Sequence, residues 1–105
     1  MSALEARCLQ PKPLSFQLGA LCMTPGVARL MEENGFNPFY HLGRHGRGDW
    51  GELCEDDQAE NCRALEQGGR LFSSYTLGDQ FPAEKIWIIT EADRSVTTIL
   101  LPDEY

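Results

Sequence analysis

The sequence predicts an α+β domain, with about three short helices packed on one face of an antiparallel sheet of about four strands. Two observations predict this class. One alternating apolar stretch lies near the start of the chain, and three segments rich in β-branched and aromatic residues lie near its end. Between them, apolar residues follow helical spacing and are punctuated by proline and glycine. The expected order is therefore β-α-α-α-β-β-β.

The first strand is expected over residues 14–23, LSFQLGALCM. Alternate residues of this stretch are apolar: Leu14, Phe16, Leu18, Ala20 and Cys22. This alternation predicts a strand with one buried side. Residues 1–13, which end in PKP, are expected to form a flexible N-terminal arm, and residues 14–105 a single domain.

Proline and glycine mark the expected helix ends. The first helix should begin after Thr24, an N-cap followed by proline, and end at Gly35. Asn37-Pro38 repeats this cap-plus-proline signal and opens a short helix through residues 39–42, which the glycines that follow should keep from extending far. A third helix is expected over about residues 56–67, because its acidic start suits a helix N-terminus and two glycines follow it.

Three β-rich segments complete the domain: residues 70–77, 85–92 and 95–102. The links GDQFPAE and ADRS predict that they pair as an antiparallel meander. The middle segment, with its run IWII, is apolar on both faces, which predicts a central strand covered on both sides or by a partner. The last is expected at the sheet edge, where no lysine would block pairing with a second copy.

Composition and charge argue against several function classes. The chain has 105 residues, and its longest apolar runs are far shorter than the roughly 20 residues of a membrane span. The N-terminus lacks the pattern of an export signal, so we expect a cytoplasmic protein without membrane contact. Sixteen acidic against nine basic residues give a net charge of −7, which disfavours general nucleic-acid binding.

The four cysteines form no recognised metal or redox motif. Cys8, Cys22, Cys54 and Cys62 include no C-x-x-C pair, so neither a zinc ribbon nor a thioredoxin-type pair is indicated. Without an export signal they are expected to be reduced thiols. Cys22 and Cys62 are expected on apolar faces. No cofactor is predicted.

The glycine-rich stretch HLGRHGRGDWGEL is the first candidate site. His41, His45 and Asp49 are four residues apart and would share a face of a continuous helix, as metal-binding histidines do. Glycines interrupt that continuity, so no metal is expected. Asp49 should accept backbone N–H bonds, and Trp50 should fold back as an anchor. In the alternative interpretation, Arg47, Asp49 and Trp50 form a binding loop.

The turn between the last two strands holds the second candidate site. Glu91 and Arg94, with His45 from the helical half, could form a metal-independent ribonuclease site. There a base activates the 2′-hydroxyl, a cation stabilises the phosphorane and an acid protonates the leaving oxygen. The competing interpretation is a charged hairpin turn in which neighbouring acids neutralise Arg94. Arg94 also remains a candidate for binding.

Three segments resemble a known group: HGRGDWG at residues 45–51, GGRLFSSY at 68–75 and KIWIITEADRSVTTILLPDEY at 85–105. They are similar to small bacterial proteins of unknown function, termed plasmid-related, that occur on plasmids and other mobile elements. The resemblance implies a mobile-element accessory role and no particular chemistry. The layout of helices followed by a meander is also similar to that of microbial ribonucleases and RelE-type toxins, an analogy of fold alone.

The leading hypothesis is a non-catalytic accessory protein that binds a protein partner, a second copy of itself, or both. The alternatives are a small metal-independent ribonuclease of toxin type and an acidic DNA mimic. A concave basic pocket containing His45 and Arg94 would favour the ribonuclease, and rows of carboxylates at phosphate-like spacing would favour the mimic. A flat apolar patch would favour a protein partner.

Overall fold

The computed structural model describes residues 14–77 and 84–105. Its elements run β1 (Ala20–Met23), α2 (Pro25–Asn34), α3 (Phe39–Gly46), α4 (Glu55–Gln67), β2 (Leu71–Thr76), β3 (Lys85–Thr90), β4 (Val96–Leu100) and the 3-10 helix η1 (Pro102–Glu104). The predicted α+β class and element order are confirmed. The expected N-terminal arm, residues 1–13, and most of the GDQFPAE loop lie outside the described residues.

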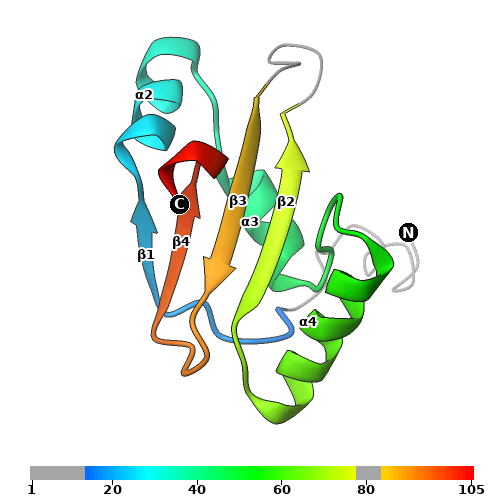
Figure 1. Ribbon diagram of the computed structural model, residues 1–105. Coiled ribbons are helices and arrows are strands. Elements are labelled where there is room, and N and C mark those ends of the chain that lie inside the picture. The colour runs from blue at the N-terminus through cyan, green and yellow to red at the C-terminus, as the bar shows by residue number, and fades with distance from the viewer. Residues whose placement is uncertain (1–13, 78–83) are drawn as a thin grey trace, which may run out of the picture.

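The described strands form one mixed sheet in the order β1-β4-β3-β2 (Figure 1). The predicted antiparallel meander is confirmed, because β2 pairs with β3 and β3 with β4. β1 joins in parallel, with Cys22 opposite Thr98 of β4. The expectation that residues 95–102 form the sheet edge is therefore wrong, since β4 lies between β1 and β3. Pairing of the first strand with the last is a non-local contact, which patterns of consecutive strands do not indicate.

The first strand is shorter and more exposed than its alternation predicted. β1 spans only Ala20–Met23, and all four residues are exposed. The chain turns just before it, at Gly19, where φ is +68° and a Cβ would lie 2.3 Å from the Ser95 carbonyl oxygen. Phe16 is half-buried outside the strand. Cys22 and Cys62 are exposed, so their expected placement on buried apolar faces is wrong.

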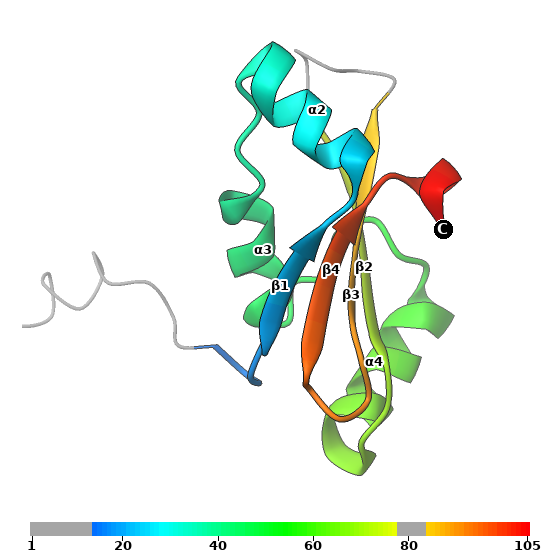
Figure 2. The ribbon, with the colours of Figure 1, turned by 90° about the vertical axis from the view of Figure 1, so that its left-hand side faces the viewer.

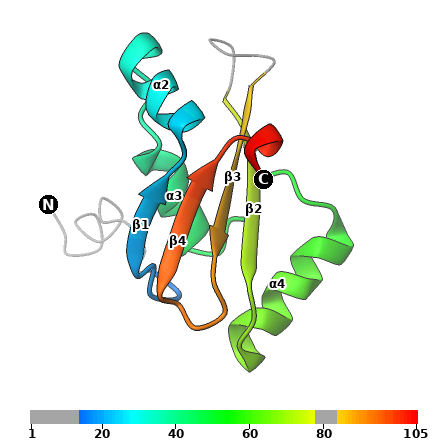
Figure 3. The same ribbon diagram turned by 60° about the vertical axis from the view of Figure 1, so that its left-hand side comes forward.

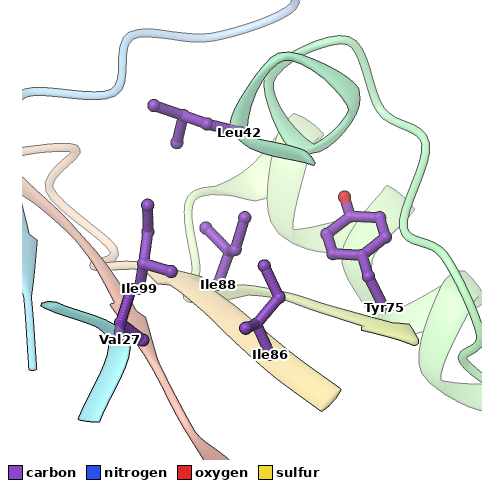
Figure 4. Packing of buried hydrophobic residues seen from close by; sticks show 6 residues of the cluster. All are labelled: Val27, Leu42, Tyr75, Ile86, Ile88 and Ile99. Carbon is purple, nitrogen blue, oxygen red and sulfur yellow. The ribbon is translucent and has the colours of Figure 1, made fainter. Parts of the chain in front are cut away.

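The hydrophobic core lies between one face of the sheet and the helices α2 and α3 (Figure 2). Six buried side chains form it (Figure 4): Val27, Leu42, Tyr75, Ile86, Ile88 and Ile99. Fully burying such a side chain contributes about 1.5–3 kcal/mol each. This cluster therefore holds the helices on the sheet and fixes the position of α3, which carries both histidines.

The ends of α2 follow the predicted signals. Gly35 ends the helix in the left-handed conformation, and its N–H donates to the Met31 carbonyl oxygen at 3.1 Å. At the start, the Glu104 carboxylate of η1 accepts hydrogen bonds from the Thr24 hydroxyl at 2.5 Å and the Gly26 N–H at 2.8 Å. An anion at a helix N-terminus is favourable, so η1 anchors the end of the described chain on α2.

The helix α3 is longer than predicted, because it continues through Gly43 and ends at Gly46. Its residues Leu42 and His45 are buried against the sheet. A glycine inside a helix costs about 1 kcal/mol relative to alanine, less than the burial of such side chains contributes. The helix therefore passes the first of its glycines and remains short, as expected, because it ends at Gly46.

The helix α4 lies beside β2, away from the layer formed by α2 and α3 (Figure 3). Its buried Asn61 donates to the Phe72 carbonyl oxygen at 2.7 Å and accepts from the Phe72 N–H at 3.2 Å. Further along β2, the Ser74 N–H donates to the Trp50 carbonyl oxygen, and the Ser74 carbonyl oxygen accepts from the Glu52 N–H. The Asn61 side chain and the loop at residues 50–52 thus form hydrogen bonds with backbone groups of the β2 edge. Another strand would need these groups in order to pair with β2.

None of the helices in the described part of the chain combines the length and the apolar character needed to cross a membrane.

Candidate functional site

The glycine-rich loop, residues 41–53, begins inside α3, so His41 and His45 lie one turn apart on a continuous helix. Their spacing does not make a metal site, because both ring nitrogens of His45 are hydrogen-bonded and Asp49 pairs with Arg44. Residues 14–77 and 84–105 contain no group of three His, Cys, Asp or Glu side chains placed to hold a metal ion.

Asp49 organises the turn that follows α3. Its carboxylate accepts from Arg44 Nε at 2.7 Å, from Arg44 Nη2 at 3.2 Å and from the Gly51 N–H at 3.2 Å. The predicted backbone bond is therefore confirmed. Hydrogen bonding to Arg44 lowers the pKa of Asp49. The Asp49 carbonyl oxygen accepts from the Tyr75 hydroxyl at 2.6 Å, which ties the turn to β2.

Trp50 is the apolar anchor of the same loop, as predicted, with 6% of its surface exposed. Its ring stacks on Phe16 at 6.2 Å between centroids and meets His45 edge-on at 5.6 Å. Next to it, Gly51 has φ +75°, and a Cβ there would lie 2.1 Å from the Ser74 carbonyl oxygen. The glycine is needed because the loop approaches β2 this closely.

His45 is fully buried at the centre of a polar chain that crosses the sheet. Its Nδ1 lies 2.5 Å from Ser73 Oγ, and its Nε2 lies 2.9 Å from Thr90 Oγ1. Thr90 Oγ1 lies 2.7 Å from Thr97 Oγ1, which donates to the Leu18 carbonyl oxygen at 2.6 Å. Buried polar groups are costly without partners, and here each has one.

The last acceptor sets the direction of the bonds from His45 Nε2 onward. Because a carbonyl oxygen only accepts, the Thr97 hydroxyl donates to Leu18, and the Thr90 hydroxyl then donates to Thr97. His45 Nε2 must therefore carry a hydrogen for Thr90. Burial, and secondarily the charge of Arg94, lowers the pKa of His45 to about 3, so the imidazole is neutral near pH 7. In this neutral form the hydrogen is on Nε2, and Nδ1 accepts from the Ser73 hydroxyl.

Arg94 has a structural role that the sequence did not predict. It adopts φ +60°, and its guanidinium donates to four backbone carbonyl oxygens, those of Gly69 (2.5 Å), Ala64 (3.0 Å), Glu91 (3.0 Å) and Ala92 (3.2 Å). The expectation that neighbouring acids neutralise Arg94 is therefore wrong. Ala64 lies in the last turn of α4, and its carbonyl oxygen also accepts from the Gly68 N–H, so Arg94 joins its own turn to the C-terminal end of α4.

The structure brings together only some of the predicted site residues. His45 and Arg94 both contact the Phe16 ring, at 5.3 Å and 5.7 Å. His45 is fully buried with both ring nitrogens bonded, whereas Arg94 is half-buried and its guanidinium is bonded to backbone carbonyl oxygens. The Glu91 carboxylate instead faces Arg70 at 3.8 Å, and Arg47 caps α3.

A further candidate site, missed from the sequence, lies on the sheet face opposite α2 and α3, which we term the open face. It is a pocket of about 210 Å³ lined by Arg70, Phe72, Trp87, Ile89 and Tyr105. Its aromatic rings meet edge-on, Phe72 with Trp87 at 5.0 Å and Trp87 with Tyr105 at 5.8 Å. The one signal in the sequence was the middle strand, apolar on both faces.

The charged residue of this pocket is Arg70, which is half exposed. Its guanidinium lies 5.4 Å from the centre of the Tyr105 ring and 3.8 Å from the Glu91 carboxylate. A second shallow pocket, of about 240 Å³, shares Arg70, Ile89 and Tyr105 with the first and continues toward Thr24. The open face thus offers one apolar pocket and one of mixed polar and apolar lining, beside a cation whose ion pair is long and solvent-accessible.

No protein-family model matches the chain, and comparisons with curated proteins and with solved structures find no match. In the glycine-rich loop the side chains of Trp50 and His45 are buried inside the fold, whereas on the open face an aromatic pocket remains accessible.

Proposed function

We propose that this chain is a non-catalytic accessory protein that binds another protein through the open face of its sheet. The observation that carries the proposal is the pocket formed by Phe72, Trp87 and Tyr105 around Ile89, with Arg70 at its side. Tryptophan, tyrosine and arginine are the residues that most often dominate the binding energy of protein interfaces. An exposed apolar patch rimmed by polar groups is typical of such interfaces.

The size and charge of the pocket indicate the kind of partner. At about 210 Å³ it is smaller than the roughly 300–1,000 Å³ of small-molecule sites, and it suits one apolar side chain of a protein. Arg70 can exchange its long pair with Glu91 for a carboxylate on the partner. We infer a partner segment with an aromatic or aliphatic residue next to Asp or Glu.

The resemblance to plasmid-related proteins supports an accessory role on a bacterial mobile element. It rests on residues 45–51, 68–75 and 85–105. These segments include most of β2 and all of β3, which supply most of the pocket lining.

Peptides selected from a random library on the immobilised full-length chain provide the test. We expect them to carry the inferred apolar-acidic pair and to bind Trp87→Ala at least about tenfold more weakly, a loss of about 1.4 kcal/mol. Removing Trp87 takes away the ring that contacts both other aromatic side chains of the pocket. Phe39→Ala, at an exposed aromatic residue of α3, serves as the matched control. Equal binding to parent and Trp87→Ala would exclude the open face.

The ribonuclease alternative makes an opposite prediction for RNA. A general base must reach the 2′-hydroxyl, yet His45 is fully buried with both nitrogens bonded. We expect no cleavage of single-stranded RNA or tRNA by the parent protein. Cleavage lost in His45→Ala and in Arg94→Ala would contradict this, provided that thermal melts show both variants folded. Glu91→Gln, at an exposed side chain, would test the acid of the same site.

A further inference from the structure

The two edges of the sheet are treated differently by the fold. The β2 edge is occupied by Asn61 and by the segment around Gly51. At the β1 edge, no strand, bridge or side-chain amide within residues 14–77 and 84–105 pairs with the outward backbone groups. Figure 2 shows β1 at the border of the sheet, nearest the viewer. Proteins normally protect such an edge, since it can pair with another strand.

The backbone direction along β1 follows from its bonds to β4. The Ala20 N–H donates to the Ser95 carbonyl oxygen at 2.9 Å, and the Thr24 N–H donates to the Ile99 carbonyl oxygen at 3.1 Å. Backbone groups alternate in direction along a strand. The N–H and C=O groups of the odd-numbered residues, Leu21 and Met23, therefore point away from β4 to the free edge.

We propose that β1 pairs antiparallel with β1 of a second copy of this chain, about a two-fold axis at Cys22. With Cys22 opposite its own copy, Leu21 of one chain faces Met23 of the other, and each such pair exchanges two N–H···O=C bonds. The two-fold axis repeats the pair, which satisfies all outward backbone groups of both residues. A self-complementary contact of this kind closes as a dimer.

The side chains of β1 suit a second copy of the same acidic protein. The strand reads ALCM and carries no charge, so two chains of net charge −7 meet here without opposed carboxylates. Leu21 and Met23 are 45% and 40% exposed, and pairing would cover them. A four-residue edge buries much less than the roughly 1,600 Å² of a standard interface. We therefore expect a weak dimer, with a Kd on the order of 10 µM.

Cys22 reports the proposed register directly. Opposite residues of a non-hydrogen-bonded antiparallel pair have Cα atoms about 4.5 Å apart, within the roughly 4.4–6.8 Å range of disulfides. A full-length chain that keeps only Cys22, with Cys8→Ser, Cys54→Ser and Cys62→Ser, is treated with the thiol oxidant diamide. The matched chain keeps only Cys62, which is exposed on α4.

We expect the Cys22 chain to form a covalent dimer at least about tenfold faster than the Cys62 chain, in line with the close Cα approach in that pair. Leu21→Lys in the Cys22 chain should remove this advantage, because a lysine blocks edge pairing. Tyr40→Lys makes the same charge change at an exposed residue of α3 and should leave it intact. Equal rates for both cysteines, or indifference to Leu21→Lys, would overturn the proposal. Sedimentation of the parent at about ten times the expected Kd should show mostly dimer, and a monomer alone would also overturn it.

Discussion

Replacing Trp50 by alanine is expected to lower the free energy of unfolding by about 3–5 kcal/mol, the usual cost of removing a buried aromatic side chain. The ring is 6% exposed and packs against Phe16 and His45, so its loss leaves a cavity beside the buried polar chain. Urea denaturation of parent and variant measures the difference.

Tyr40→Ala is the control for this substitution, since Tyr40 is 68% exposed. We expect it to change the free energy of unfolding by less than about 1 kcal/mol. If Trp50→Ala unfolds at the same urea concentration as the parent, Trp50 does not anchor the loop, and a ligand-binding role for its ring becomes the better explanation.

Acidification is expected to destabilise the protein before its carboxylates titrate. Burial lowers the pKa of His45 to about 3, whereas in the unfolded chain it is about 6.5. Between these values the unfolded state binds one more proton than the folded state, so stability rises with pH. As pH falls below about 6.5, His45 alone should remove about 1.4 kcal/mol per pH unit. Burial also lowers the pKa of His41, which adds in the same direction.

The histidine effect can be separated from that of the carboxylates. Hydrogen bonds lower the pKa values of Asp49 and Glu104, so their contribution is complete above about pH 5.5 and is lost progressively at more acidic pH, as carboxyls of the unfolded chain bind protons. Urea denaturation between about pH 6.5 and about pH 5.5 therefore reports the histidines. His45→Gln, which keeps a donor and an acceptor, should make the free energy of unfolding depend less on pH in this window. His41→Gln should reduce this dependence by a smaller amount. If His45→Gln leaves the pH dependence of the free energy of unfolding unchanged, His45 is not a buried neutral histidine.

Local signals in the sequence were sufficient for most of the fold. The Thr-Pro start and glycine end of α2, the acidic start of α4 and the three β-rich segments each act within a few residues. Pairing of β1 with β4 was missed, because it joins segments about 75 residues apart in sequence, and alternation near Phe16 does not specify it. Likewise α3 passes Gly43 because burial against the sheet outweighs helix propensity.

The candidate site was harder to predict than the fold. Trp50 and Asp49 were assigned correctly, since a glycine-rich turn with one aromatic residue has few ways to become ordered. The bonds of Arg94 to backbone carbonyls leave no sequence pattern, because every residue offers the same acceptor. The pocket on the open face combines β2, β3 and the residue after η1, so only the strand register reveals it.

We propose that the open face, and not the glycine-rich loop, contacts the partner. The chain has two tryptophans, one in each place, Trp50 in the loop and Trp87 in the pocket. Their indole N–H groups give two separate NMR signals, which can be followed while the tightest selected peptide is added. We predict that the Trp87 signal shifts in proportion to occupancy while the Trp50 signal stays in place. A shift of the Trp50 signal together with the amide signals of Arg44 and Asp49, while the Trp87 signal does not move, would contradict binding at the open face.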